Sequence, residues 1–270
     1  MKIRAIIWVV VGLIVAVSTA PAQESSQRSL QALEQRSAVD LLDQADQALF
    51  PESFVATLRM TTERPGRRTT EMLMDSSHRE GSGTLMEVQE PSRSRGMRFL
   101  QKDDDLWMYN PRSGSRRAIR LSPRDSFQGS VFSNNDVADP DYSDDYRAEH
   151  AGTEEIRHDQ LGAVLTVKIT ATASHDQAAY GRIDMWLWPG TGGETGAAIP
   201  LRMDYYSRSG LLFKRMTLSD IGPLAGAERP ALMRMESLEE AGAVTTVRIE
   251  DLEGRSNLPQ RMFNQQELTR

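Results

Sequence analysis

The octapeptide S-F-Q-G-S-V-F-S at residues 126–133 places two phenylalanines in a stretch that otherwise contains mostly small and polar residues. An aromatic strand is predicted just before it, at residues 106–110 (L-W-M-Y-N), with a turn at 111–114 and a return strand over 116–121. A loop normally lies on the surface and is polar. Two phenylalanines in this loop therefore indicate a flap that packs over an apolar surface, which the rest of the chain must supply.

Segments of alternating apolar and polar residues lie on both sides of this loop. The first begins at Ser53 and places Phe54 and Met60 on one face, and the longest covers residues 161–171. Each segment is separated from the next by a turn rich in Gly, Pro, Asp or Ser, which is typical of an antiparallel meander. Strands do not alternate with helices, which argues against a parallel sheet. We therefore predict a mainly β fold with a single large, strongly curved antiparallel sheet.

One helix is predicted with clear end signals. Apolar residues recur at helical spacing over residues 38–49. Ser37 and Asp40 resemble an N-terminal capping box, and Pro51 ends the helix. One helix is too small to bury the whole concave face of such a sheet. We therefore expect this N-terminal helix and the 126–133 loop to form a lid, and part of the face to line a cavity.

The N-terminus has the pattern of a cleavable secretion signal. Lys2 and Arg4 precede an apolar run over residues 5–17, and Ala20-Pro21-Ala22 forms an A-x-A cleavage site. The run is shorter than the roughly 20 residues that a membrane-spanning helix needs. We therefore predict a signal peptide over residues 1–22, export to the periplasm, and no stable membrane insertion after cleavage.

The chain after the signal is predicted to contain a flexible polar segment over residues 23–36 and a single domain over residues 37–270. No composition break separates two cores, and the domain is expected to be a monomer. The formal net charge is −6 and there is no long Lys/Arg block, which does not suit nucleic-acid binding. Because the chain has no cysteine, its stability in an oxidising compartment must come from core burial.

The residue pattern gives no support for an enzyme, a cofactor or a metal site. There is no G-x-S-x-G elbow, P-loop or dinucleotide fingerprint. The acidic run over 136–145 lacks the spacing and the glycine of a calcium loop, so we predict a solvated loop there. Residues 103–105 (D-D-D) are predicted as a hairpin turn. The four histidines are scattered near predicted turns and strand ends: His78, His150, His158 and His175.

What remains for function is apolar surface, in which methionine is frequent, with 13 in the chain. Methionine is flexible and polarisable, and it suits surfaces that accept varied apolar ligands. Because few polar groups converge, the expected ligand is long and apolar. The residues predicted to line the cavity or its lid are Leu58, Met60, Met97, Phe99, Trp107, Tyr109, Phe127, Phe132 and Met185.

The order W-x-Y-x-P at residues 107–111, basic residues at 116–120, and S-F-x-G-S-x-F-S-x-x-D at 126–136 resembles a signature of the LolA-like periplasmic carriers. These belong to the outer-membrane lipoprotein-sorting family, and the signature is that of an uncharacterised branch of it. Further matches lie within residues 201–210 and 249–263, so the resemblance covers about Ala38 to Leu268. In that branch Asp often stands at the position of Val131, Met at that of Gln128 and an aromatic at that of Asn134.

The resemblance implies a half-barrel of antiparallel strands closed by helices around a hydrophobic cavity for acyl chains. It also implies a carrier that shuttles lipid or lipoprotein between an inner-membrane transporter, its expected partner, and the outer membrane. The nine cavity and lid residues would then contact the acyl chain. The alternative is a sensor or regulatory module of envelope stress on the same fold.

Overall fold

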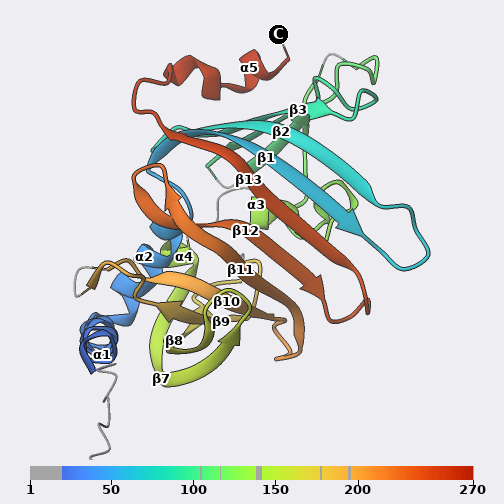
Figure 1. The fold of residues 1–270 in the computed structure, drawn as a ribbon. Helices are drawn as coiled ribbons and strands as arrows, with labels where there is room; N and C mark the ends of the chain where they lie inside the picture. The colour runs from blue at the N-terminus through green and yellow to red at the C-terminus, as the bar shows by residue number, and fades with distance from the viewer. Residues whose placement is uncertain are drawn as a thin grey trace, which may run out of the picture.

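The computed structural model describes residues 20–103, 105–115, 117–137, 142–176, 178–193 and 196–269. Within these residues, thirteen strands form one sheet in which every neighbouring pair is antiparallel. The sheet is strongly curved, and its concave face encloses a helix and several short segments (Figure 1). The predicted mainly β fold with one curved antiparallel sheet is thereby confirmed.

The first series of strands runs outward from the middle of the sheet to one edge, each strand pairing with the one before it. These strands are β1 (Ser53–Glu63), β2 (Thr70–Arg79), β3 (Gly83–Glu90), β4 (Arg98–Lys102), β5 (Asp105–Tyr109) and β6 (Ile119–Arg120). The alternation that begins at Ser53 thus becomes β1, and the aromatic strand becomes β5 with β6 as its return partner.

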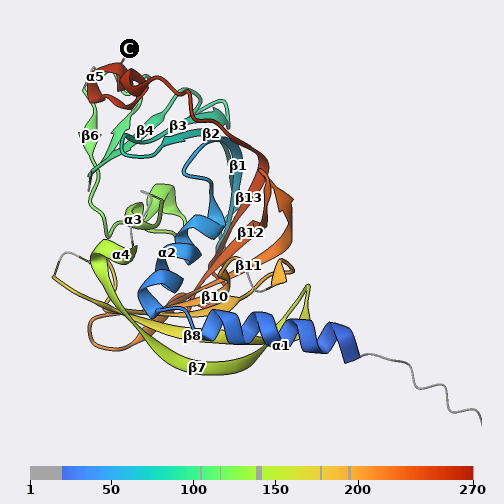
Figure 2. The same cartoon turned by 90° about the vertical axis from the view of Figure 1, so that its left-hand side faces the viewer.

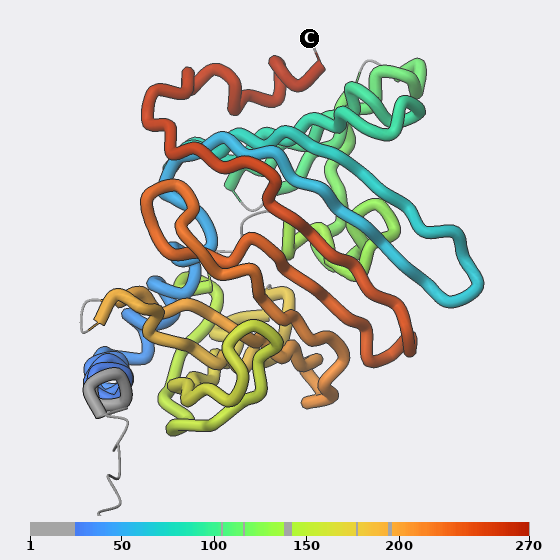
Figure 3. Tube along the Cα trace, viewed as in Figure 1, coloured from blue at the N-terminus to red at the C-terminus, as the bar shows by residue number. Residues whose placement is uncertain are grey.

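The second series starts at the opposite edge and returns to the middle. Its strands are β7 (Tyr146–His158), β8 (Gly162–Ala173), β9 (Arg182–Trp188), β10 (Ile199–Tyr206), β11 (Leu212–Leu224), β12 (Ala227–Ser237) and β13 (Val244–Gly254). The last strand, β13, pairs with β1 and joins the two series. The Cα trace shows β13 beside β1 although they come from opposite ends of the chain (Figure 3).

The two edge strands are unsuited to pairing with another chain. β6 has two residues, and β7 exposes charged side chains over most of its length. Short or charged edges are common protections against edge-to-edge association. The sheet therefore ends on both sides without a long apolar edge.

The predicted helix over residues 38–49 is α2 (Ala38–Leu49). The Ser37 hydroxyl accepts a hydrogen bond from the Asp40 N–H at 3.1 Å, as the capping pattern predicts. α2 lies inside the curve of the sheet and packs against β7, β8, β10 and β12 (Figure 2). Ala48 is buried in place of the predicted Leu49, together with four residues of the apolar stripe predicted from the sequence: Ala38, Leu41, Leu42 and Ala45.

The structure differs from the prediction of a flexible segment over residues 23–36. A second helix, α1 (Ala20–Glu34), packs against β8 (Figure 2). Leu30 and Leu33 are its buried residues and join the cluster that contains Leu41 and Leu42 of α2. Two leucines in a polar stretch are a weak helical signal, and they gain a partner surface only once the sheet has formed.

The far side of the sheet is also partly covered. The chain leaves β13 through the 3₁₀ helix η3 (Gln260–Phe263) and the short helix α5 (Gln265–Leu268), which pack on β3 and β4. Phe263 and Leu268 are buried there against Leu100. This C-terminal tail therefore covers part of the convex face of the sheet.

The predicted signal peptide lies outside the described residues except for its last three, Ala20–Ala22, which begin α1. Among the helices in the described part of the chain, none is both long and apolar enough to span a membrane.

Candidate functional site

The 126–133 loop and the short helix that follows it fold into the concave side of the sheet. We call residues 126–137 the plug; it contains the 3₁₀ helix η1 (Phe127–Gly129) and α3 (Asn134–Val137). Gln128 and Gly129 take left-handed conformations, with φ of 50° and 78°, so the chain turns sharply. The Phe127 N–H then donates to the Phe132 carbonyl at 2.9 Å.

Both phenylalanines of the plug pack on an apolar surface, as predicted. Phe127 is fully buried, and its ring centroid lies 4.8 Å from that of Phe99 on β4. Phe132 is 6% exposed and belongs to the same core. Phe127 therefore acts as a core residue that holds the plug in place. Phe132 instead faces two cavities, which are described below.

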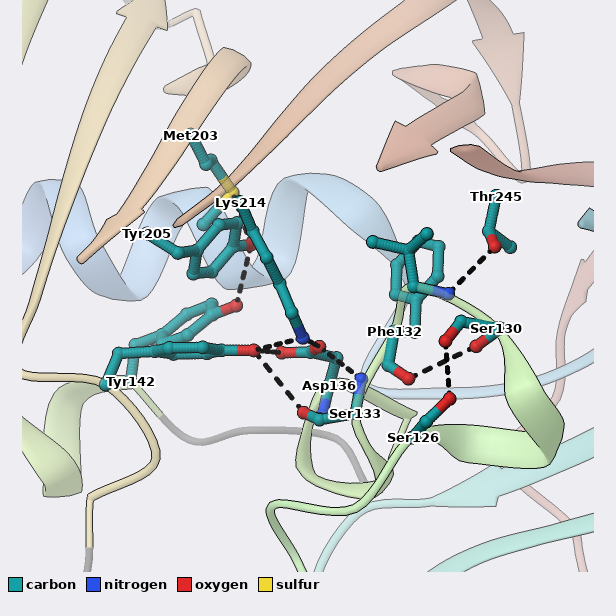
Figure 4. A network of polar contacts seen from close by, with 12 residues as sticks. Ser126, Ser130, Phe132, Ser133, Asp136, Tyr142, Met203, Tyr205, Lys214 and Thr245 are labelled. Atoms are coloured by element: carbon teal, nitrogen blue, oxygen red, sulfur yellow. Dashed lines mark hydrogen bonds and ion pairs between the residues drawn. The ribbon is translucent and has the colours of Figure 1, made fainter. Parts of the chain in front are cut away.

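Hydrogen bonds fix the plug to the sheet at its outer end. The Val131 N–H donates to the Thr245 hydroxyl of β13 at 2.9 Å (Figure 4). That hydroxyl lies 3.0 Å from the hydroxyl of Thr62 on β1. Arg64 donates to the carbonyls of Gly129 and Ser130 at 3.2 and 3.3 Å. The contact at Val131 uses only its backbone N–H, so it does not depend on the side chain at this position.

Two adjoining cavities lie between α2, the plug and the concave face. The larger has a volume of about 220 Å³ and the smaller about 120 Å³. Both are lined mainly by apolar side chains from several strands. Five residues line both cavities: Phe50, Phe54, Phe132, Asp136 and Met233. Phe132 of the plug thus contributes to the walls of both cavities.

The register of the central strands explains the methionine-rich wall of the smaller cavity. Met60 on β1 lies opposite Val247 on β13, which in turn lies opposite Met233 on β12. All three line the cavity. Next to this row, Leu58 pairs with Met74 on β2, and both also line it.

The nine residues predicted for the cavity and its lid fall into three groups. Leu58, Met60 and Phe132 line the cavities. Met97, Phe99, Phe127 and Met185 are buried in the same inner core without lining either cavity. The remaining two lie on the opposite face of the sheet, so that part of the prediction is wrong.

Trp107 and Tyr109 are the two misplaced residues. Side chains alternate between the two faces of a strand, and Leu106 and Met108 are the inward residues of β5. Because Trp107 lies opposite Leu100 and Met108 lies opposite Phe99, Trp107 faces the C-terminal tail. Aromatic character alone did not reveal which face the two residues occupy.

Several cavity residues were missed in the sequence. They include Met74, Met86, Met216, Met235 and Val247, together with Phe50 after α2. The five strand residues among them each face inward in the alternation of their own strand. Their convergence depends on which strands are neighbours, and no local pattern reveals that β1 pairs with β13.

A buried polar network fastens the inner end of the plug. The Asp136 carboxylate lies 3.4 Å from the Lys214 ammonium group of β11 and accepts hydrogen bonds from the Ser133 N–H, at 2.7 Å, and from the Tyr180 hydroxyl (Figure 4). The side chains of Asp136 and Lys214 are 5% and 15% exposed. The prediction of a solvated loop is therefore wrong at Asp136, which pairs across the interior.

Three buried tyrosines surround this network. Tyr180 also contacts Lys214, and the hydroxyls of Tyr142 and Tyr205 lie 3.4 Å apart. Burial raises the pKa of Tyr142, Tyr180 and Tyr205 well above the ordinary value, and nearby acidic groups and tyrosines add to this. The phenols therefore stay protonated and serve as hydrogen-bond donors.

These pKa values predict a loss of stability in alkali. Below pH ~10 the folded and unfolded chains both keep the tyrosine protons; above it only the folded chain does. The free energy of unfolding should fall by about 1.4 kcal/mol per pH unit for each such tyrosine. Urea denaturation at pH 9, 10 and 11 measures this, and Tyr180→Phe should have a shallower slope. A free energy that stays constant from pH 9 to 11 would contradict the burial of the three phenols.

One of the four histidines has a structural partner in the interior. His158 is buried at the end of β7, and its Nε2 lies 2.7 Å from the Leu218 carbonyl. Over the described ranges, no group of three or more His, Asp and Glu side chains is placed to hold a metal ion.

Solved structures define the class of fold. A LolA superfamily protein from Nitrosomonas europaea aligns with a TM-score of 0.71 at 23% identity, covering 85% of this chain and 98% of its own. A domain described as that of an outer membrane lipoprotein-sorting protein from Vibrio parahaemolyticus aligns at 0.72 and 22% identity, covering 88% and 100%. A DUF1329 family protein from Desulfovibrio piger aligns at 0.71 and 23% identity, covering 86% and 97%. The chain therefore has the same fold as these three proteins, which confirms the resemblance seen in the sequence at the level of the fold.

Residues 80–270 match the profile of a family described as "Uncharacterized protein", and the chain belongs to that family. No curated protein matches the sequence.

Proposed function

We propose that this protein is a periplasmic carrier that holds the acyl chain of a lipid or lipoprotein in the space between α2, the plug and the concave face. One observation carries the proposal: two adjoining, mainly apolar cavities lie where six methionines converge, namely Met60, Met74, Met86, Met216, Met233 and Met235. Such walls accept flexible apolar ligands of varied shape. The LolA-type fold and the lipoprotein-sorting description of one similar structure support the same reading.

The carrier would act after export. The predicted signal peptide over residues 1–22 supports a periplasmic location for the single domain over 37–270. An inner-membrane transporter and an outer-membrane acceptor are the partners that a shuttle between the two membranes requires. No catalytic step is part of the proposal.

The cavities in this structure are small for a long ligand. Each is below the roughly 300–1,000 Å³ of a typical ligand pocket. Phe132 lines both cavities, and its displacement would join them. We therefore regard the structure as the closed form, in which Phe132 and its neighbours fill space that an acyl chain would take. Burial stabilises such a chain by about 0.8 kcal/mol per CH₂ group.

The direct test is to ask what the purified protein carries. Lipid extracted from the protein is identified by mass spectrometry, and binding of a fluorescent fatty acid is measured in parallel. The proposal expects co-purified lipid or saturable probe binding. The proposal is wrong if no lipid co-purifies with the protein and none of several acyl probes binds to it.

A filled cavity should block the same probe. Met233 lines both cavities and is 7% exposed, so Met233→Trp is expected to lower probe affinity at least tenfold, or about 1.4 kcal/mol. Met97→Trp is the matched control, because Met97 has the same exposure on the same face and lines neither cavity. Overpacking costs both variants about 1–3 kcal/mol of stability. Equal probe affinity in the two variants would place the ligand elsewhere.

A further inference from the structure

A polar pocket adjoins the larger apolar cavity at the point where α2 runs into β1. We call it the arginine pocket, because Arg79, Arg229 and Arg255 line it; its volume is about 710 Å³. It shares Gln47, Phe50, Pro51 and Glu52 with the apolar cavity. An apolar chain and a polar group attached to it could therefore occupy the two spaces at once.

Arg229 of β12 is the unusual residue of this pocket. It is 9% exposed, and its Nη1 donates to the Gln47 carbonyl in the last turn of α2 at 2.5 Å. Its Nε is buried and has no hydrogen-bond partner among the described residues. Nor does any carboxylate in the described part of the chain form an ion pair with it.

A comparison with a second arginine shows why this matters. The Nε atom of Arg182 is also buried without a hydrogen bond, but it lies 3.2 Å from the Asp184 carboxylate. Buried charges in proteins are normally paired. The hydrogen bond to the Gln47 carbonyl satisfies one nitrogen of Arg229, and a cation at the C-terminal end of a helix is favourable. It leaves the charge without an anionic partner.

The other charged groups of the pocket do not supply that partner. Glu52 and Glu80 line it but are exposed to solvent. Arg255 pairs with Glu253 at 2.7 Å, and Arg79 donates to the Leu258 carbonyl at 2.8 Å. Burial lowers the pKa of Arg229, as expected for a cation that has lost water without gaining a carboxylate.

We propose that the arginine pocket receives the anionic head group of an acyl ligand, a carboxylate or a phosphate, with the chain in the adjoining apolar cavity. The inference rests on the proposed carrier function and narrows its cargo to anionic lipids. A guanidinium group suits both head groups, because its planar set of donors matches their oxygen atoms. Arg229 would thereby gain the partner that it lacks.

The experiment compares palmitate, its methyl ester and palmitoyl lysophosphatidic acid as competitors of a fluorescent acyl probe on the full-length exported protein. Palmitate and the lysophosphatidic acid are expected to bind at least about tenfold more tightly than the ester. Arg229→Met should remove this preference, weakening both anionic ligands roughly ten- to a hundredfold while leaving the ester unchanged. Arg229→Lys should keep part of the preference. Arg248→Met changes an exposed arginine that lies outside the pocket and should keep all of it.

Each other outcome has a definite meaning. If the acid and the ester bind the wild-type protein equally, the head-group site is wrong and the carrier function stands. If no acyl ligand binds, the carrier function fails and the inference fails with it. Inorganic phosphate alone, titrated by calorimetry, must bind far more weakly than the lysophosphatidic acid; equal affinity would overturn the lipid assignment. If Arg229→Met does not fold, the inference is tested by the ratio of the affinities for palmitate and its methyl ester. This ratio is measured for the wild type and should be smaller for Arg229→Lys.

Discussion

Replacing Phe127 with alanine is expected to lower the free energy of unfolding by about 3–5 kcal/mol. The ring is fully buried and packs on Phe99, so its removal leaves a cavity that the surrounding strands cannot close. The plug also carries Phe132 and Asp136, and loss of its anchor should loosen both. Urea denaturation monitored by circular dichroism measures the change.

Tyr109→Ala is the control for this substitution. Tyr109 is an aromatic residue at the end of β5, but it is only partly buried and lies on the outer face. Its removal should cost clearly less. A loss below about 1 kcal/mol for Phe127→Ala would be typical of a surface change, and would mean that residues 126–133 form a loose flap rather than a packed plug.

The second large effect is expected at Lys214. Lys214→Met leaves the Asp136 carboxylate buried beside Tyr180 without a cation, and breaking a buried pair in this way costs about 3–5 kcal/mol. The hydrogen bonds that Asp136 keeps from the Ser133 N–H and from Tyr180 place the expected loss at the lower end of this range. Urea denaturation of the variant at neutral pH measures it.

Two further variants separate burial from simple charge loss. Arg248→Met breaks an exposed pair with Asp220, in which both side chains are about half exposed, and should cost about 0–1 kcal/mol. Adding Asp136→Asn to Lys214→Met removes both buried charges and should restore part of the lost stability. An equal loss of unfolding free energy in Lys214→Met and Arg248→Met would show that the Asp136–Lys214 pair is solvent-exposed rather than buried.

The spacing of apolar residues along the chain was sufficient to predict the sheet and α2. The alternation at Phe54 and Met60, and the capping signal at Ser37, depend only on residues close together in the chain. The burial of both phenylalanines in a polar loop was likewise predictable, since such residues rarely face water in pairs. These features are local, and tertiary structure only confirms them.

The missed features depend on contacts between distant segments. Trp107 faces outward because β5 pairs with β4 in one particular register. Asp136 stands in an acidic run that looks solvated, and its partner Lys214 comes from a strand far along the chain. Leu33 of α1 is buried in a cluster with residues of α2 and the sheet, and α1 packs on β8, a strand far along the chain. In each case the segment that determines the burial or direction of the side chain is not adjacent in the sequence.

The central claim is that an acyl chain lies between α2, the plug and the concave face. Photo-crosslinking with a fatty acid that carries a diazirine on its chain, followed by peptide mass spectrometry, tests it most directly. The account predicts labels on residues that line the cavities, with Met60, Phe132 and Met233 foremost, and loss of these labels when unlabelled palmitate competes. Labels confined to the outer face around Trp107 and Phe263, or labels that palmitate does not displace, would contradict it.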